Sequence, residues 1–340
     1  MNQFILDLLQ DDSFSQATLG EAVQRGGKVW GKIKQMGVFR FIGISTSTVA
    51  IDVEKDNIII LPQTQRGGSA TYEKKLSRNA IYFGIPNFKR KEVLTPQDLQ
   101  NVRDTGTASL KSLQSAVMQA VGKIDRKIEV THEYLMAGAL RGNVMDGEGN
   151  VIANLFQKFG KTQSTVNLTL AATDKAILGQ LSGAEDIIDT NLDNDVSTGK
   201  LMLCSPEYWA ALLSNSAIFE IYKNRDKAGN PYLNGISDGF QLGGFYCVKY
   251  SGTLKNKAGS VQRLIPANEA IGLPIGTEST FVMYGAPADL LEYVNQEGQE
   301  KYFKTVYDSK DGEDNVIVRG ETNPLPICTR PDVLIRFTKS

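Results

Sequence analysis

The stretch from residue 49 to residue 93 constrains the fold of this chain more than any other feature. It predicts a strand, a polar tip over 63–70 and a returning strand, with Arg66, Gly67 and Gly68 supplying the flexible backbone of the reversal. Each arm would run to about 15 residues, against about 5–6 for an ordinary strand, and the ribbon would project roughly 50 Å. A two-stranded ribbon is only marginally stable in water because little of its surface is covered. The segment therefore needs cover from outside itself.

The composition fits a folded protein with a sizeable core and excludes some classes of partner. The 340 residues are 41% hydrophobic, which is enough for two domains. Lysine and arginine number 37 against 38 aspartate and glutamate, whereas general affinity for nucleic acid needs a basic surface. There is no run of 18 apolar residues, and the opening MNQFILDLLQDDSF reaches acidic residues too early for a secretory leader. We expect a soluble protein, intracellular when made, with no membrane partner.

The longest helical pattern covers residues 107–141. Apolar residues recur there at three- and four-residue steps, which gives one stripe suited to packing on a sheet. Gly122 within this stretch predicts a close approach of another segment. Residues 166–284 then predict a mixed α/β unit, and the chain beyond 285 predicts a meander of short strands.

Motifs for catalysis or metal binding are weak. His132 is the single histidine, so no pair of histidines can form a metal site, and a structural or surface role is favoured. The three cysteines, Cys204, Cys247 and Cys328, lie far apart without a C-x-x-C pair, which predicts buried thiols rather than disulfides. STGK at 197–200 resembles the end of a phosphate loop but lacks the required first glycine and the Ser or Thr after the lysine.

An acidic cluster between residues 185 and 195 is the remaining candidate for chemistry. Its carboxylates could hold a hard cation such as calcium, but the order of an EF-hand loop is not met, and a solvated face is the favoured interpretation. The sequence therefore predicts no catalytic residue, no metal and no cofactor. The cluster consists of Glu185, Asp186, Asp189, Asp193 and Asp195.

Three long segments carry a family resemblance, in order along the chain. The first is TSTVAIDVEKDNIIILPQTQRGG with IPNFKRKEVLTPQDLQNVR, and the second is ALRGNVMDGEGNVIANLF. The third is YGAPADLLEYVNQEGQEKYFKTVY, followed by NPLPICTRPDVLIRF. Together they cover nearly the whole chain, and they are similar to the major capsid protein E family of tailed bacteriophages, the lambda type.

The resemblance implies an α+β fold, the tailed-phage capsid fold of the HK-ninety-seven type. Its expected parts are an N-terminal arm (1–48), an extended E-loop hairpin (49–95), a peripheral P domain with a long spine helix (96–165 and 285–340), and a central A domain (166–284). The residue patterns, taken without the family, predict the same four pieces.

The resemblance also implies a structural role and a set of partners. Hexamers and pentamers of such a chain form the icosahedral head of the virion around double-stranded DNA, which is enclosed without sequence-specific binding. Assembly would take place in the host cytoplasm. Portal and decoration proteins are implied partners, and a scaffold would be a separate protein because the chain has no long charged helical segment at its N-terminus. Some relatives cross-link lysine to asparagine between subunits, but nothing marks a ribbon lysine here as desolvated, so no cross-link is expected.

In the family the E-loop lies across a neighbouring subunit, which would supply the cover that the ribbon needs. We expect apolar ribbon residues to pack on that neighbour and ribbon arginines to pair with its carboxylates. The candidate contact residues are Ile58, Ile60, Arg66, Tyr82, Phe83, Phe88 and Arg90. Three alternatives stay open: a flexible hairpin within a monomer, a soluble two-domain enzyme that uses carboxylates near 185–195 or in DSKDGEDN, and a phage tail or connector component.

Overall fold

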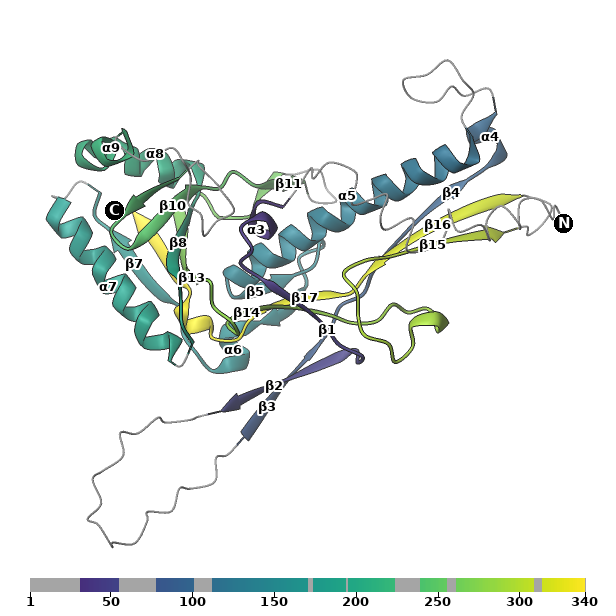
Figure 1. The fold of residues 1–340 in the computed structure, drawn as a ribbon. Helices are drawn as coiled ribbons and strands as arrows, with labels where there is room; N and C mark the ends of the chain where they lie inside the picture. The colour runs from purple at the N-terminus through teal and green to yellow at the C-terminus, as the bar shows by residue number, and fades with distance from the viewer. Residues whose placement is uncertain are drawn as a thin grey trace, which may run out of the picture.

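A 28-residue helix, α5 (Leu113–Leu140), joins two differently built regions in the computed structural model of the chain (Figure 1). The structure describes residues 31–54, 78–100, 112–170, 174–193, 195–223, 239–255, 261–308 and 314–339. A six-stranded sheet with helices on it lies at one end of α5, and a three-stranded sheet runs along the other half of the helix. The predicted α+β class is confirmed.

Each half of α5 packs into a different apolar cluster. Toward the N-terminus of the helix, Val117 and Val121 are at most 1% exposed and contact the three-stranded sheet. Toward its C-terminus, Leu135 lies in the larger cluster around the six-stranded sheet. The helix predicted over 107–141 is confirmed for Leu113–Leu140, while residues 107–111 lie outside the described part of the chain.

The six-stranded sheet has the order β7-β18-β13-β8-β10-β9. β10 is parallel to β8 and β18 is parallel to β7, whereas the other neighbours are antiparallel. The last strand of the chain thus lies between β7 and β13, although the expected division assigns its residues to the P domain. The strands are β7 (Ser164–Leu168), β18 (Ile335–Lys339), β13 (Glu269–Ile275), β8 (Gly199–Cys204), β10 (Phe245–Lys249) and β9 (Gly239–Leu242).

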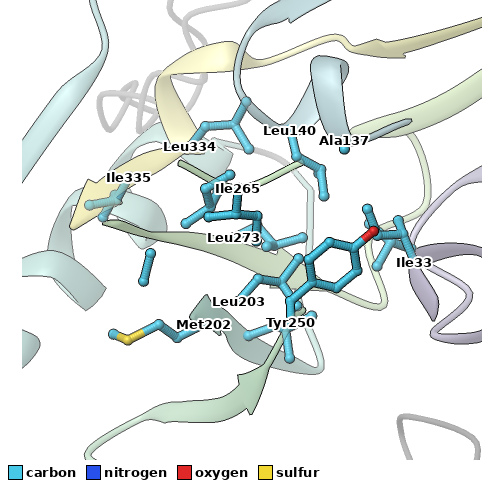
Figure 2. Packing of buried hydrophobic residues seen from close by; sticks show 14 of the residues in the cluster. Ile33, Ala137, Leu140, Met202, Leu203, Tyr250, Ile265, Leu273, Leu334 and Ile335 are labelled. Atoms are coloured by element: carbon cyan, nitrogen blue, oxygen red, sulfur yellow. The ribbon is translucent and has the colours of Figure 1, made fainter. Parts of the chain in front are cut away.

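Three helices cover this sheet, with α7 (Asp174–Leu192) on one side and α8 (Pro206–Ser214) with α9 (Ser216–Lys223) on the other (Figure 1). The junction of β8 and α8 follows the sequence pattern, because the Ser205 hydroxyl accepts a hydrogen bond from Tyr208 N (3.3 Å) and proline occupies the first helical position. Leu203 and Leu273 of adjacent strands pack into the same cluster as residues of α5 and the N-terminal segment (Figure 2).

The three-stranded sheet has the order β15-β16-β4, and its strands are β15 (Tyr302–Asp308), β16 (Asn315–Thr322) and β4 (Phe88–Leu94). All its pairs are antiparallel. β4 corrects the expectation of one continuous ribbon over 49–93. The returning arm divides, because β3 (Arg78–Gly84) pairs with β2 (Thr48–Glu54) whereas β4 leaves the ribbon and pairs with β16 of its own chain.

Shorter elements connect these units. β1 (Arg40–Gly43) runs parallel to β14 (Phe281–Gly285), which pairs on its other side with β17 (Pro324–Cys328). The remaining elements are α3 (Lys32–Gln35), α4 (Pro96–Leu99), β5 (Asn143–Met145), β6 (Val151–Asn154), α6 (Leu155–Phe159), β11 (Thr253–Lys255), β12 (Val261–Arg263), η3 (Leu291–Tyr293) and η4 (Pro331–Val333). Among the described residues, no helix combines the length and the apolar character needed to cross a membrane.

Two glycines of α5 have opposite surroundings. A Cβ added at Gly122 would meet nothing within 4 Å, so the close approach predicted there is wrong. At Gly138 an added Cβ would lie 2.9 Å from Asn143 O and 3.3 Å from Val144 Cα, both backbone atoms. The close approach therefore occurs near the C-terminal end of the helix, where the chain turns back into β5.

The two glycines give a matched test of this packing. Gly122→Ala is expected to raise the free energy of unfolding by about 0.5–1 kcal/mol, because alanine loses less backbone entropy in a helix and has room there. Gly138→Ala is expected to lower it by about 1–3 kcal/mol, because the methyl group would overlap backbone atoms that cannot move independently. Urea unfolding measures the free energy of unfolding of both variants. Equal changes in the two variants would contradict the close approach at Gly138 and the open space at Gly122.

Candidate intersubunit surface

The described base of the ribbon, formed by β2 and β3, has two unlike faces. Val49 is paired with Phe83 across the ribbon, and these side chains are 7% and 3% exposed. Ala50 is paired with Tyr82 on the other face, where Tyr82 is 65% exposed. Because successive side chains of a strand point to opposite faces, one face of the ribbon packs on the body of the chain and the other faces outward.

Phe83 anchors the ribbon to α6. Its ring lies 5.8 Å from the ring of Phe159, and the Lys158 ammonium lies 5.8 Å from the centre of the Phe83 ring, within the range of a cation–π contact. Phe83 belongs to the large apolar cluster together with Val49 and Ile51. The base of the ribbon is therefore covered by its own chain, whereas the sequence pattern predicts cover from a neighbouring subunit.

The seven predicted contact residues fall into three groups. Ile58, Ile60 and Arg66 lie outside the described residues. Tyr82 on β3 and Arg90 on β4 are exposed, and Phe88 at the start of β4 is half-buried against the large cluster. Phe83 is the correction: its side chain is used within its own chain, so we leave it out of the proposed contact with a neighbour.

A buried carboxylate, Glu321 of β16, fixes the root of the ribbon. Glu321 is 1% exposed and accepts hydrogen bonds from Asn87 Nδ2 (2.7 Å), Asp289 N (2.7 Å) and Asn323 Nδ2 (3.3 Å). Arg319 Nη2 also donates to it, at 2.7 Å. Burying a carboxylate is costly unless donors replace water, and these donors come from separate segments of the chain. Glu321 thereby ties the linker between β3 and β4 to the loop that follows β14.

A second buried carboxylate, Glu133 of α5, holds the segment that enters from the N-terminal side. Glu133 Oε1 accepts hydrogen bonds from Ile33 N (3.0 Å) and from Tyr250 Oη (2.7 Å). It therefore joins the short helix α3, the spine helix α5 and the residue that follows β10. Burial raises the pKa of Glu133 above its ordinary value, although the hydrogen bond from Ile33 N opposes that shift.

A row of charged side chains continues from this point along α5. Lys34 Nζ of α3 lies 2.7 Å from Glu300 and 3.4 Å from Glu129, and Lys301 pairs with both Glu129 and Asp125. Burial acts against the ionised form of Glu129, but the hydrogen bond and charge of Lys301 prevail and lower its pKa. The polar side of α5 is thus bound to α3 and to the start of β15.

His132 lies in the same region and is fully buried, in agreement with a structural role. Its Nε2 lies 2.7 Å from Thr322 Oγ1, and that hydroxyl donates its proton to Glu300 O (2.6 Å). The Thr322 oxygen must therefore accept, which assigns the proton to Nε2 of a neutral ring. Burial, with the nearby Lys34 charge, lowers the pKa of His132 to about 3, so the ring stays neutral at physiological pH.

Three residues of the acidic cluster at 185–195 connect elements of the fold. Asp189 pairs with Lys200 of β8 at 2.8 Å, and Glu185 accepts a hydrogen bond from Gly244 N at 2.6 Å. Asp195 accepts hydrogen bonds from Glu278 N, Ser279 N and the hydroxyls of Ser279 and Thr280. Within the described residues, no three His, Cys, Asp or Glu side chains are grouped so as to hold a metal ion.

The three cysteines are buried, and one small hollow lies beside α5. Cys204, Cys247 and Cys328 are buried and free, as predicted, and burial raises the pKa of the Cys204 and Cys328 thiols. A hollow of about 10 Å³ is lined by residues of α5 and β5 with Leu264, and it has room for about one water molecule.

Comparison with known families decides the assignment. The profile of the phage major capsid protein E family matches residues 15–339. The chain belongs to the phage major capsid protein E family. This is a family of structural proteins, and the match confirms the resemblance drawn from the three long segments.

Relatives in this family are similar along their whole length. The major capsid protein of Pseudomonas phage KPP10 is 25% identical, with 96% of this chain and 97% of the relative aligned. The major capsid protein of Salmonella phage Felix O1 (isolate Felix O1-VT1) is 24% identical, with 95% of each chain aligned. The expected role as a major capsid protein of a phage is confirmed by these relatives.

Solved structures support the fold independently of sequence identity. The capsid of Ralstonia phage GP4 is 11% identical with a TM-score of 0.54, covering 93% of this chain and 96% of the other. The mature capsid of bacteriophage PhiM1 is 12% identical with a TM-score of 0.51, covering 93% and 89%. The expected tailed-phage capsid fold is confirmed.

The buried Glu133 gives a prediction for pH dependence. Because its pKa is raised in the folded protein, the folded state holds the proton more tightly than the unfolded state. The stability that this proton contributes is lost as the pH rises above 4.5, the ordinary pKa of a glutamate. Glu133→Gln removes that dependence. Between pH 4.5 and pH 7, the free energy of unfolding of the variant is expected to rise relative to wild type.

Urea unfolding at several pH values measures this difference. Glu148→Gln is a suitable control, because Glu148 is exposed in the turn between β5 and β6. The buried-carboxylate explanation would be contradicted if the free energies of unfolding of the Glu133→Gln variant and wild type differed by the same amount at every pH.

Proposed function

We propose that this chain self-assembles as hexamers and pentamers into the icosahedral head of a phage, which encloses the double-stranded DNA genome. The observation that carries the proposal is the ribbon, whose base is anchored through one face while its other face presents Tyr82 to solvent. An anchored root with an uncovered face suits a contact with an adjacent copy. Heterologous contacts of this kind close into rings, and rings with a second type of interface close into a shell.

The contact residues follow from this arrangement. Tyr82 would pack on the neighbour as an aromatic anchor, and Arg66 and Arg90 would pair with its carboxylates. Ile58 and Ile60 would supply apolar contact from the part of the ribbon beyond β2. Strand edges that the ribbon leaves open would be satisfied by the neighbouring subunit.

The partners and the place of action extend the same proposal. A separate scaffold protein, a portal and a decoration protein would assemble with the shell in the host cytoplasm, and the finished protein would lie in the virion. DNA would be enclosed without sequence-specific binding, and the nearly balanced charge of 37 basic and 38 acidic residues supports loose rather than tight contact with it. The chain would act through assembly alone, with no catalysis and no cofactor.

Size-exclusion chromatography combined with negative-stain electron microscopy tests the proposal directly. Shells, or separate hexamers and pentamers, are the expected result. A discrete monomer or small oligomer that turns over a substrate would instead support a two-domain enzyme. Open tubes or a single ring would support a tail or connector component.

Removal of the ribbon tip separates folding from assembly. Deletion of residues 63–70 is expected to leave a soluble, folded subunit that forms no shells, because the tip would rest on the neighbour rather than on its own chain. Electron microscopy and circular dichroism of the purified variant measure the two properties. Normal particles from the deletion would end the proposed role of the tip.

The neighbouring residues Tyr82 and Phe83 give a matched pair on the two faces of the ribbon. Tyr82→Ala is expected to change the stability of the subunit by at most about 0.5 kcal/mol but to reduce the yield of shells. Phe83→Ala is expected to destabilise the subunit itself by about 3–5 kcal/mol, because it removes a buried aromatic ring. Thermal unfolding measures the stability of both variants, and particle counts measure their yield of shells. A destabilised Tyr82→Ala subunit beside a stable Phe83→Ala subunit would contradict the assignment of the two faces.

A further inference from the structure

The loop between β14 and β15 presents an unusual apolar side chain. Leu291 is 96% exposed and Val294, three residues later, is 57% exposed. Single exposed apolar residues are common and need no explanation. This pair differs because the loop around it is held firmly in place, so the two side chains cannot turn inward.

The base of the loop is closed by glycines in close backbone contact. Gly298 N donates a hydrogen bond to Ile44 O (3.0 Å), and Ile44 N donates to Gly285 O (2.8 Å). A Cβ at Gly43 would lie 2.2 Å from Gly298 O, and one at Gly298 would lie 2.0 Å from Gly285 O. Only glycine fits at these positions, and the start and end of the loop are fixed against β1.

The body of the loop is braced against β15. The ring of Tyr293 lies edge-on to that of Tyr302 with centroids 4.9 Å apart, and Tyr302 Oη accepts a hydrogen bond from Gln299 N (2.7 Å). Gln296 Nε2 donates to Glu292 O (2.7 Å), and the Glu292 carboxylate pairs with Lys304. The loop is therefore a preformed projection with Leu291 at its surface.

The outer face of the β15-β16-β4 sheet offers a complementary surface. In cross-strand register, Val306 lies beside Ile317, which lies beside Val93. Val306 is 42% exposed and Val93 is 49% exposed, and the opposite face of the sheet is buried on α5. We call Val306, Ile317 and Val93 the valine row. The loop of the same subunit contacts only part of this face: Glu292 pairs with Lys304, and Asp289 O accepts a hydrogen bond from Arg319 Nη2. The valine row lies beyond these contacts and stays exposed.

The charges of the two surfaces are opposite. Residues 286–300 contain four acidic residues and no lysine or arginine, whereas β4 carries three basic residues and one acidic residue. Within one subunit, Lys89 of β4 pairs with Asp289 of the loop, so loop carboxylates and β4 lysines are suited to pair with each other. Among the ion pairs of the described residues, none involves Glu297 of the loop or Lys91 of β4, so both side chains are available to a second copy.

We propose that the Leu291 loop of one copy docks on the valine row of a second copy, with Glu297 of the first beside Lys91 of the second. Within one subunit the loop contacts the sheet through Glu292 and Asp289, but Leu291, Val306 and Val93 all remain exposed there, so the proposed contact of Leu291 with the valine row lies between copies. The contact is heterologous, and it supplies an interface additional to the ribbon. The inference rests on the proposed assembly, whose second type of interface it identifies.

Cysteine cross-linking of assembled protein tests the contact. The native thiols are buried and will not compete. Leu291→Cys combined with Val306→Cys, treated with a short bismaleimide, is expected to give a ladder of covalent oligomers on a denaturing gel. Leu291→Cys combined with Val196→Cys is the matched control, since Val196 is 75% exposed but lies elsewhere, before β8. Equal ladders from the two pairs, or linkage by Leu291→Cys alone, would overturn the proposed docking.

A charge exchange provides a second readout. Glu297→Lys or Lys91→Glu in the cross-linking background is expected to lower the ladder by about fivefold to tenfold, and the two together are expected to restore it. No recovery in the double variant would contradict the pairing. If shells form but the cysteine pair gives no cross-linked ladder, the proposed contact is wrong and the proposed assembly stands. If cross-linked oligomers form but no shells are seen, the contact stands and the proposed shell is wrong.

Discussion

Apolar burial along α5 holds the two regions of this protein in one arrangement. The first half of the helix packs Val117 and Val121 on the three-stranded sheet, and the second half packs Leu135 and Leu140 into the cluster of the six-stranded sheet. Protein interiors are packed as closely as organic crystals, so a shift of the helix against either sheet would disturb the other. The helix spans about 42 Å at 1.5 Å per residue, and it carries this constraint across the molecule.

Two buried carboxylates attach the projecting segments to that frame. Glu133 binds the segment that enters from the N-terminal side, and Glu321 binds both the root of the ribbon and the loop after β14. A buried carboxylate is tolerated only when several donors surround it, and that requirement fixes the geometry of the donors as well. The projecting segments thus leave the body in defined directions, as an assembling subunit requires.

The distribution of charged groups fits a structural protein. Three of the five residues in the acidic cluster are engaged within the fold: Asp189 with a lysine of β8, Glu185 with a backbone amide, and Asp195 with a neighbouring loop. His132 is neutral and hydrogen-bonded inside the core. These groups stabilise junctions between elements. Fixed junctions suit a structural protein, in agreement with membership in the phage major capsid protein E family.

The sequence by itself determined the elements that depend on local signals. Helical periodicity predicted α5, the Ser205-Pro206 cap predicted the junction of β8 and α8, and long segments in family order predicted the capsid fold. The tertiary structure alone decided which face of the ribbon turns inward, because the alternation of Tyr82 and Phe83 defines two faces but not which of them meets Phe159. It also decided that β4 pairs with β16. Contacts between residues far apart in the chain leave no local pattern, since they depend on what the rest of the fold brings beside them.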